Sequence, residues 1–405
     1  MNMPRVTLEV LQAIRRSRKP VSKAELVRLT NYSLATITEH TEILLRNHLA
    51  LESDRGPSTG GRKPQLLSFN AEAGYIAAID LESTHAGVGI TDLNCNILIS
   101  ESSNDIDVAA GPAAVLEQIK DLVLALLRNK GIERSQVKGI GMGLPGPVEY
   151  SRGLPASLSI MPGWDRYPIR EFWAQHFECP LYVDNNVHTM ALGEQMLEQD
   201  SKVDNLIFLK IGNGIGAGII CNGHIYRGST ECAGNVGHIN IGHDFLCYCG
   251  NRGCLEALAG GRAIAARAEQ MARDGQSELL AAILAEKKKL TLADVRKAVE
   301  ESDPVAVELM REGGTAIGNV LASLVNFFNP ALVLIGGGVS QVGDVLLASI
   351  RQAVYQRSLP LTTRNLSIQH SLLGEQAGIV GAAVLTFNEI MHMPFVNREL
   401  TFTYK

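Results

Sequence analysis

Residues 225–260 have the sequence IYRGSTECAGNVGHINIGHDFLCYCGNRGCLEALAG, in which Cys247, Cys249 and Cys254 are closely spaced and His238 lies nine positions before the first of them. Thiolates and imidazole suit Zn²⁺, and a set of one histidine and three cysteines is typical of a closed, tetrahedral structural site. The interleaved glycines allow a short loop to turn its thiolates toward one point. We therefore expect one structural zinc ion per chain, bound by His238, Cys247, Cys249 and Cys254.

The overall composition of the chain is typical of a soluble protein. The chain has 405 residues, of which 46% are hydrophobic and 20% charged, enough for two or three ordinary domains. No stretch approaches the 18 or so uncharged apolar residues of a membrane span, and the N-terminus lacks the features of a secretory signal. We expect a cytoplasmic protein without a membrane partner, in which clustered thiols bind metal rather than form disulfides.

Charge is distributed unevenly along the chain. Residues 1–65 carry 11 Lys and Arg against 6 Asp and Glu, a net charge of +5, whereas the remainder carries 26 against 36, a net charge of -10. A small basic unit on a large acidic body suggests that the basic unit binds a polyanion. On charge alone, a solvated basic surface remains an alternative.

The N-terminal pattern favours DNA binding. Residues 7–50 predict three short helices, with Ser22 and Glu25 forming a capping box at the start of the second. Residues 34–45 then correspond to the recognition helix of a helix-turn-helix, and two short strands around the basic tip at 52–64 form a wing. We predict a winged helix-turn-helix domain over residues 1–70. Its candidate DNA contacts are Leu34, Ala35, Thr36, Thr38 and His40 in the helix and Arg55, Arg62 and Lys63 in the wing.

Two of these helix positions have an alternative interpretation. Thr38 and His40 are also compatible with solvated polar positions. The wing residues, in contrast, would reach phosphates or the minor groove, where contacts anchor a protein without reading sequence.

From Gly74 onward the pattern changes to strands alternating with helices, in two similar halves. Strands are predicted at 75–81, 87–91, 137–142, 180–183, 206–211, 216–221 and 331–335, and helices at 112–129, 188–199, 305–328 and 378–388. This alternation is typical of an α/β protein with a cleft between its halves.

Six segments resemble motifs of the ROK family of repressors, open reading frames and sugar kinases. They are the 225–260 stretch together with GMGLPGPV, GWDRYPIREFW, DNNVHTMALGE, KIGNGIGAGII and PALVLIGGGVS, in the family's order over about residues 75–387. The resemblance implies a two-lobed, actin-like ATPase (ribonuclease H-like) fold for residues 71–405, with a sugar cleft, a structural zinc and a homo-dimer or tetramer. The basic head followed by SxGGRxP resembles the family's repressor branch.

The same resemblance implies that catalysis has been lost. ROK kinases carry Asp-x-Gly-Gly-Thr as a first phosphate loop, whereas this chain has Asp80-Leu81-Glu82-Ser83-Thr84, where Glu82 adds repulsion toward phosphates. The position of the kinase base is Asn186, and an amide cannot accept the proton of a sugar hydroxyl. Asp184 could replace it only if the loop shifted by two residues. We therefore expect no catalytic residue and no enzyme activity.

The resemblance also assigns the sugar contacts. The family's Glu-x-Gly-His motif is Asn235-Val236-Gly237-His238 here, which indicates either an altered ligand or a cleft without one. Hydrogen bonds within their own loops are an alternative role for Asn185, Asn235 and Glu256, and zinc is the first role expected for His238. The implied sugar contacts are Gly146, Asn185, Asn186, Asn235, His238 and Glu256.

Together these features predict a transcriptional regulator of carbohydrate metabolism, most simply a repressor. It would bind operator DNA as a symmetric oligomer, under the control of a sugar or sugar phosphate in the cleft. Two alternatives remain: an ATP-dependent sugar kinase carrying a DNA-binding head, and a regulator whose signal is a partner protein.

Overall fold

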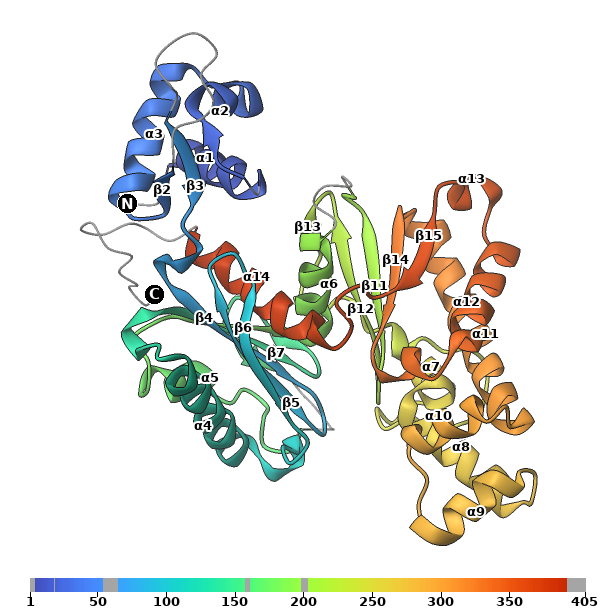
Figure 1. Ribbon diagram of the computed structural model, residues 1–405. Coiled ribbons are helices and arrows are strands. Elements are labelled where there is room, and N and C mark those ends of the chain that lie inside the picture. Colours follow the sequence, from blue (N-terminus) through green and yellow to red (C-terminus); the bar gives the residue numbers. More distant parts are fainter. Residues whose placement is uncertain (1–3, 18, 54–64, 157–160, 198–202, 392–405) are drawn as a thin grey trace.

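The computed structural model describes residues 4–17, 19–53, 65–156, 161–197 and 203–391. A small N-terminal unit lies at one end of a two-lobed body, and it is joined to the first lobe by a short connection (Figure 1). Among the described residues, the helices are all too short or too polar to span a bilayer.

The N-terminal unit contains three helices and a three-stranded antiparallel sheet in the order β1-β3-β2. The predicted capping box is present: Ser22 Oγ accepts a hydrogen bond from Glu25 N at 3.2 Å, and Glu25 Oε2 accepts one from Ser22 N at 2.7 Å. The elements are α1 (Arg5–Arg16), β1 (Val21–Ser22), α2 (Lys23–Thr30), α3 (Leu34–Arg46), β2 (Ala50–Ser53) and β3 (Leu66–Phe69).

The first lobe is built on a five-stranded sheet in the order β10-β7-β4-β5-β6. Its strands are β4 (Tyr75–Leu81), β5 (Ala86–Asp92), β6 (Ile97–Ser103), β7 (Val137–Leu144) and β10 (Leu181–Asn185), with a small hairpin of β8 (Val148–Glu149) and β9 (Leu154–Pro155). Its helices are α4 (Pro112–Lys130) and α5 (Ile169–Ala174), and α6 (Asn186–Leu197) follows directly on β10.

The second lobe has a five-stranded sheet in the order β13-β12-β11-β14-β15. Its strands are β11 (Leu206–Ile211), β12 (Ile215–Cys221), β13 (His224–Ile225), β14 (Leu332–Gly336) and β15 (Ser367–His370). The helices are α7 (Leu255–Ala259), α8 (Gly261–Arg273), α9 (Glu278–Lys287), α10 (Leu292–Glu300), α11 (Pro304–Phe328), α12 (Asp344–Arg357) and α13 (Pro360–Thr363). The last helix, α14 (Ala377–Met391), returns to pack on the first sheet.

The two sheets share one topology. In each, the first strand is central, the second and third pair antiparallel on one side, and the fourth and fifth pair parallel on the other. The prediction of two similar halves is therefore confirmed at the level of strand order. Because the halves are joined through few elements, the cleft between them is a natural place for a ligand.

Helices α6 and α14 join the lobes. Helix α6 packs on β11 and β12 of the second sheet, and α14 packs on β4 and β7 of the first. The two helices also contact each other closely, because Gly193 of α6 faces the backbone of α14. A Cβ at Gly193 would lie 2.8 Å from the carbonyl oxygen of Ala377 and 2.9 Å from the nitrogen of Gly381.

The sequence pattern missed several elements of the body. Strands β6 and β15 and helices α7–α10 and α12 were not predicted, although the predicted strands and the long helices agree with the structure to within a few residues. Strand β6 lies at a sheet edge and has partly exposed residues, so it lacks the apolar run that marks the central strands.

The α6–α14 contact predicts a difference between two helix glycines. Gly313→Ala in α11 places its methyl group 3.8 Å from its nearest neighbour and should gain up to about 1 kcal/mol of helix propensity. Gly193→Ala should instead lower the free energy of unfolding by about 1–3 kcal/mol, because backbone atoms must move. Urea unfolding followed by circular dichroism measures both; equal effects would contradict the close contact.

Candidate functional site

The structure places a cleft of about 320 Å³ between the lobes. Its walls come from the β10–α6 junction, the 145–147 turn, the glycine loop at 213–216 and the segment around His238. All six residues predicted to contact a sugar line this one cleft: Gly146, Asn185, Asn186, Asn235, His238 and Glu256.

In the cleft, Glu256 has a buried carboxylate oxygen without a hydrogen-bond partner among the described residues. Its side chain is 6% exposed, and Oε2 accepts a hydrogen bond from Ile215 N at 2.7 Å. Its other oxygen, Oε1, is buried and has no hydrogen-bond partner among the described residues. Burial is the main cause of a raised pKa at Glu256. A ligand hydroxyl would satisfy this carboxylate oxygen.

Two cleft asparagines also hold their own loops, as the alternative interpretation allowed. Asn185 Oδ1 accepts a hydrogen bond from Val187 N at 3.1 Å, and Asn235 Nδ2 donates to the carbonyl of Cys232 at 2.9 Å. Because both side chains line the cleft as well, the two roles are compatible.

Asn186 lies beside an ion pair that joins the lobes. Its Nδ2 donates to Glu82 Oε1 at 3.1 Å, and Glu82, which directly follows β4, also accepts from Lys210 Nζ of β11, at 2.6 Å to Oε2. Nearby, Asn213 Nδ2 donates to Ser83 Oγ at 2.9 Å. The first lobe is thus hydrogen-bonded to the second at two points across the cleft.

Asp80, the first residue of the altered phosphate loop, lies beneath this pair. Its side chain is 7% exposed, and Oδ1 lacks a hydrogen-bond partner among the described residues. Burial, and after it the Glu82 carboxylate, raise the pKa of Asp80 to about 8. Burial and the neighbouring carboxylate thus favour the neutral form of this carboxyl group, relative to an exposed aspartate.

The side chain of Asp184 is fully buried, and both of its carboxylate oxygens accept hydrogen bonds. It accepts from Asn185 N at 2.8 Å, His188 Nδ1 at 2.8 Å and Arg227 Nε at 2.9 Å. Burial alone would raise the pKa of Asp184, but the hydrogen bond from His188 and the charges of His188 and Arg227 outweigh it and lower that pKa. It does not line the cleft, so it is poorly placed to take a proton from a ligand there.

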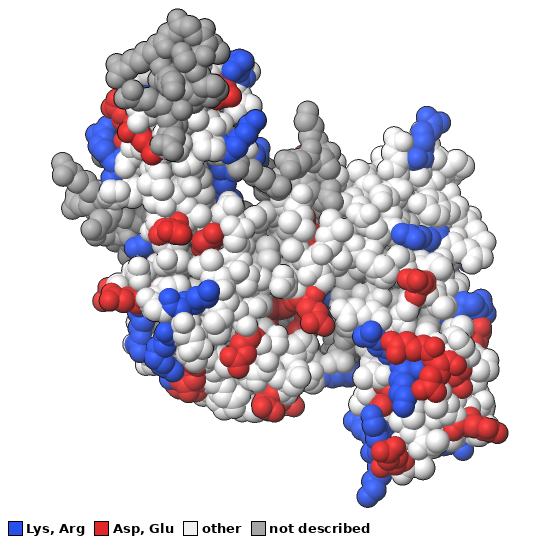
Figure 2. Space-filling view, viewed as in Figure 1, with Lys and Arg blue, Asp and Glu red and all other residues white. Residues whose placement is uncertain are grey.

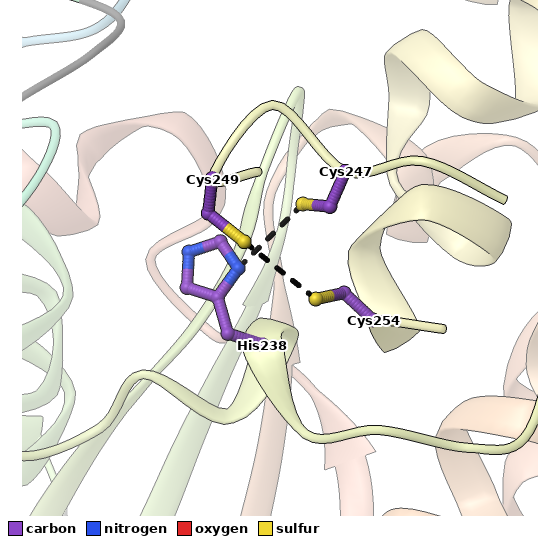
Figure 3. A group of neighbouring side chains, drawn as sticks. All are labelled: His238, Cys247, Cys249 and Cys254. Carbon is purple, nitrogen blue, oxygen red and sulfur yellow. Dashed lines mark hydrogen bonds between the residues drawn. The ribbon is translucent and has the colours of Figure 1, made fainter. Parts of the chain in front are cut away.

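The four predicted metal ligands converge on one point (Figure 3). Their ligand atoms lie within 4.8 Å of one another, with 3.7 Å between Cys247 Sγ and His238 Nδ1 and 3.7 Å between Cys249 Sγ and Cys254 Sγ. An imidazole and three thiols at this spacing suit a tetrahedral metal ion. His238, Tyr248 and Cys249 also line the cleft, so this His/Cys cluster forms part of its wall.

In the N-terminal unit, α3 presents most of its predicted DNA contacts to the surface. Leu34 is 57% exposed and Ala35 is exposed, while Thr36 and Thr38 are half-buried. Lys and Arg side chains lie on both sides of the unit (Figure 2). The wing candidates Arg55, Arg62 and Lys63 lie outside the described residues.

The prediction that His40 contacts DNA is wrong. His40 is 9% exposed, and its Nδ1 lies 2.7 Å from Thr7 Oγ1 of α1, so the ring joins two helices of the unit. The spacing already contained the reason: His40 follows the buried Ile37 by three positions and precedes the buried Leu44 by four, which places it on the inward face of α3.

Sequence reasoning also missed three cleft residues. Lys210, Tyr248 and Arg262 line the cleft but were not among the candidates. Lys210 carried a recognisable signal, because it is the single charge in the otherwise apolar strand β11. Tyr248 and Arg262 are brought to the cleft by the metal loop and the start of α8, and their sequence context gave no such signal.

A small N-terminal unit of three helices and three strands, joined to a two-lobed body with a cleft between its lobes, is an architecture that comparisons with known proteins identify. The ROK family model matches residues 76–389. The xylose repressor of Caldicellulosiruptor bescii is 30% identical over 379 residues, which cover 93% of this chain and 94% of that protein. The chain therefore belongs to the ROK family.

Solved structures agree with this assignment and with the predicted fold. A ROK family transcriptional regulator, homologous to the Escherichia coli MLC protein, has a TM-score of 0.77 at 26% identity and covers 95% of this chain and 97% of its own. A ROK glucokinase from Streptomyces griseus, in complex with glucose and AMPPNP, has a TM-score of 0.69 at 27% identity, with coverages of 78% and 100%. The predicted fold class, an N-terminal DNA-binding type of unit followed by a two-lobed, actin-like body, is thus confirmed.

The Asp184 network predicts a large, pH-dependent loss of stability. Asp184→Asn should lower the free energy of unfolding by roughly 3–5 kcal/mol at neutral pH, because Arg227 loses its buried counter-ion. Since the folded-state pKa lies below the ordinary value of 3.8, this contribution is complete above pH 3.8 and fades as the pH falls further. Asp121→Asn, at an exposed position on α4, is the control, and an equal effect would contradict the network.

Proposed function

We propose that this chain is a DNA-binding transcriptional repressor of carbohydrate metabolism, controlled by a sugar in the cleft between its lobes. The observation that carries this proposal is that one chain joins a winged unit to a cleft lined by all six predicted sugar contacts. Full-length similarity to a xylose repressor and to a ROK transcriptional regulator supports it. The glucokinase likeness covers the body alone and so supports the cleft but not the head.

We further propose that the cleft binds its ligand without transferring phosphate. The side chain in the position of the kinase base is the amide of Asn186, and the nearby carboxyl group of Asp184 is held by three donors. The Glu82–Lys210 pair adds an internal anion and its counter-ion next to the altered phosphate loop.

The His/Cys cluster is proposed to bind one structural Zn²⁺ per chain. Three thiols and one imidazole leave no open position for a substrate on a tetrahedral ion. The metal would therefore act by fixing the 238–254 loop, which carries Tyr248 and Cys249 to the cleft wall.

The N-terminal unit, residues 1–70, is called the head, and we propose that it binds operator DNA. Residues 71–405 are proposed to bind the ligand and to form a homo-dimer or tetramer. Leu34, Ala35, Thr36 and Thr38 are the proposed base-edge contacts, and Arg55, Arg62 and Lys63 the proposed wing contacts. Two heads of a symmetric oligomer bind well only when their spacing matches that of the half-sites, so a small rotation weakens both contacts together.

The zinc proposal predicts that Cys249→Ser loses the metal and loosens the surrounding loop. Cys232→Ser, a change of the same kind on a thiol outside the cluster, should keep both. Inductively coupled plasma mass spectrometry should find one zinc per chain in the wild type and the control. One zinc per chain in Cys249→Ser would contradict the ligand set.

The functional proposal predicts sugar-dependent release of DNA. DNA fragments selected by the purified protein from a random library should bind it in fluorescence anisotropy, and D-xylose or glucose should weaken that binding. Ala35→Asp should abolish DNA binding, because it introduces a negative charge on the face of α3 that would enter the groove of a polyanion. Glu256→Gln should raise the sugar concentration needed by roughly tenfold or more, because the hydrogen bond to a charged acceptor is lost. Failure to select any DNA would refute the proposal.

A further inference from the structure

Arg15, near the end of α1, connects the head to the body through its guanidinium group. Its Nε donates to Asn94 Oδ1 at 2.9 Å, and its Nη2 lies 3.3 Å from the carbonyl oxygen of Asn94 and 3.5 Å from Cys95 Sγ. The guanidinium carbon lies 4.0 Å from the centroid of the Phe387 ring. Nη2 also lies 4.0 Å from Met196 Sδ.

These partners belong to different sides of the seam between the lobes. Asn94 and Cys95 lie in the β5–β6 turn of the first lobe, and Phe387 is on α14, which packs on the first sheet. Met196 is on α6, which packs on the second sheet. A single head residue therefore contacts both the first lobe and the helix that packs on the second sheet.

Helix α6 extends from the ligand cleft to this contact. Asn186 and Val187 at its start line the cleft, and Met196 lies near its end. About 1.5 Å of rise per residue separates these positions by roughly 15 Å. Between them, Gly193 lies against the backbone of α14, so the two helices touch closely at an intermediate point. A rotation of α6 at the cleft thus also moves Met196 relative to Phe387.

The head has only one covalent link to the body, and that link is short. It leaves β3 at Phe69 and enters β4 at Tyr75, and the Phe69 ring packs edge-on against Phe387 with 6.1 Å between the centroids. Arg15 contacts the same Phe387 ring from α1. Apolar side chains of α1, such as Leu8 and Leu11, also pack near Phe387 and Met391 of α14. Within this interface, the Phe69 and Arg15 contacts with Phe387 are the directional ones, so they favour one orientation of the head.

We propose that Arg15 is the residue through which lobe closure sets the orientation of the DNA-binding head, with α6 carrying the movement from the cleft. This proposal rests on the proposed function, and it adds the route of regulation. The hydrogen bonds that the planar guanidinium donates, and its contact with an aromatic ring, depend on direction. A shift between Met196 and Phe387 therefore changes the orientation of the head in which Arg15 makes its best contacts.

The test uses hydrogen–deuterium exchange of the full chain, which requires neither an operator nor a known effector. Arg15→Ala should raise amide exchange in α1 about tenfold, since this helix loses its hydrogen bonds and its cation–π contact with the body. The neighbouring exposed residue Arg16 makes none of these contacts, and Arg16→Ala is the matched control. Arg15→Lys, which keeps the charge but lacks the planar fork, serves the same purpose if the alanine variant does not fold.

A double-variant comparison tests the route itself. Lys210→Met removes the ion pair that joins the lobes across the cleft, and it should change exchange in α1 when Arg15 is present. The change should disappear in the Arg15→Ala background and persist with Arg16→Ala. An equal change in both backgrounds, or unaltered α1 exchange in Arg15→Ala itself, would overturn the proposal.

A sugar titration separates this proposal from the proposed function. With D-xylose or glucose as the probe, Arg15→Ala should still bind sugar in calorimetry but should lose most of the sugar-dependent change in DNA affinity. A full response in that variant would overturn the role of Arg15. If no sugar affects DNA binding by the wild type, the proposed function fails, and the exchange comparison still decides the role of Arg15.

Discussion

The ion pair between Glu82 and Lys210 is the interaction on which the character of the cleft depends. It joins the two lobes where the altered phosphate loop meets β11, and Asn186 completes it with a third polar group. Both charges are largely removed from water, so each needs the other as its partner. A cleft organised in this way retains the shape of a sugar site while its phosphate side is occupied by the chain's own groups.

The remaining features connect this cleft to the rest of the molecule. The His/Cys cluster supplies one wall, the Asp184–His188–Arg227 network fixes the start of α6, and α6 leads to the contact with the head. Because each five-stranded sheet is complete within its own lobe, a relative rotation of the lobes can leave both sheets intact. Such a rotation is a known way for a small change at a ligand site to reach a distant surface.

Much of this arrangement could be predicted from the sequence, and the failures have physical causes. Cysteine spacing predicted the His/Cys cluster, and the resemblance to ROK motifs implied the six cleft residues, because both signals are local in the chain. The pairing of Glu82 with Lys210, separated by 128 positions, could not be predicted, because only the folded chain brings the two lobes together. His40 was wrongly predicted to contact DNA. A polar side chain is usually exposed, but the spacing of His40 from Ile37 and Leu44 places it on the buried face of α3.

The most direct test of the account asks whether the sugar that releases DNA is chemically altered. The protein, its selected DNA fragment, ATP, Mg²⁺ and that sugar are incubated together, and sugar phosphate is followed by ³¹P NMR while anisotropy reports bound DNA. The account predicts full release of DNA with the sugar unchanged and the ATP intact. Formation of sugar phosphate in step with release would show that the cleft still carries out the kinase reaction and would contradict it.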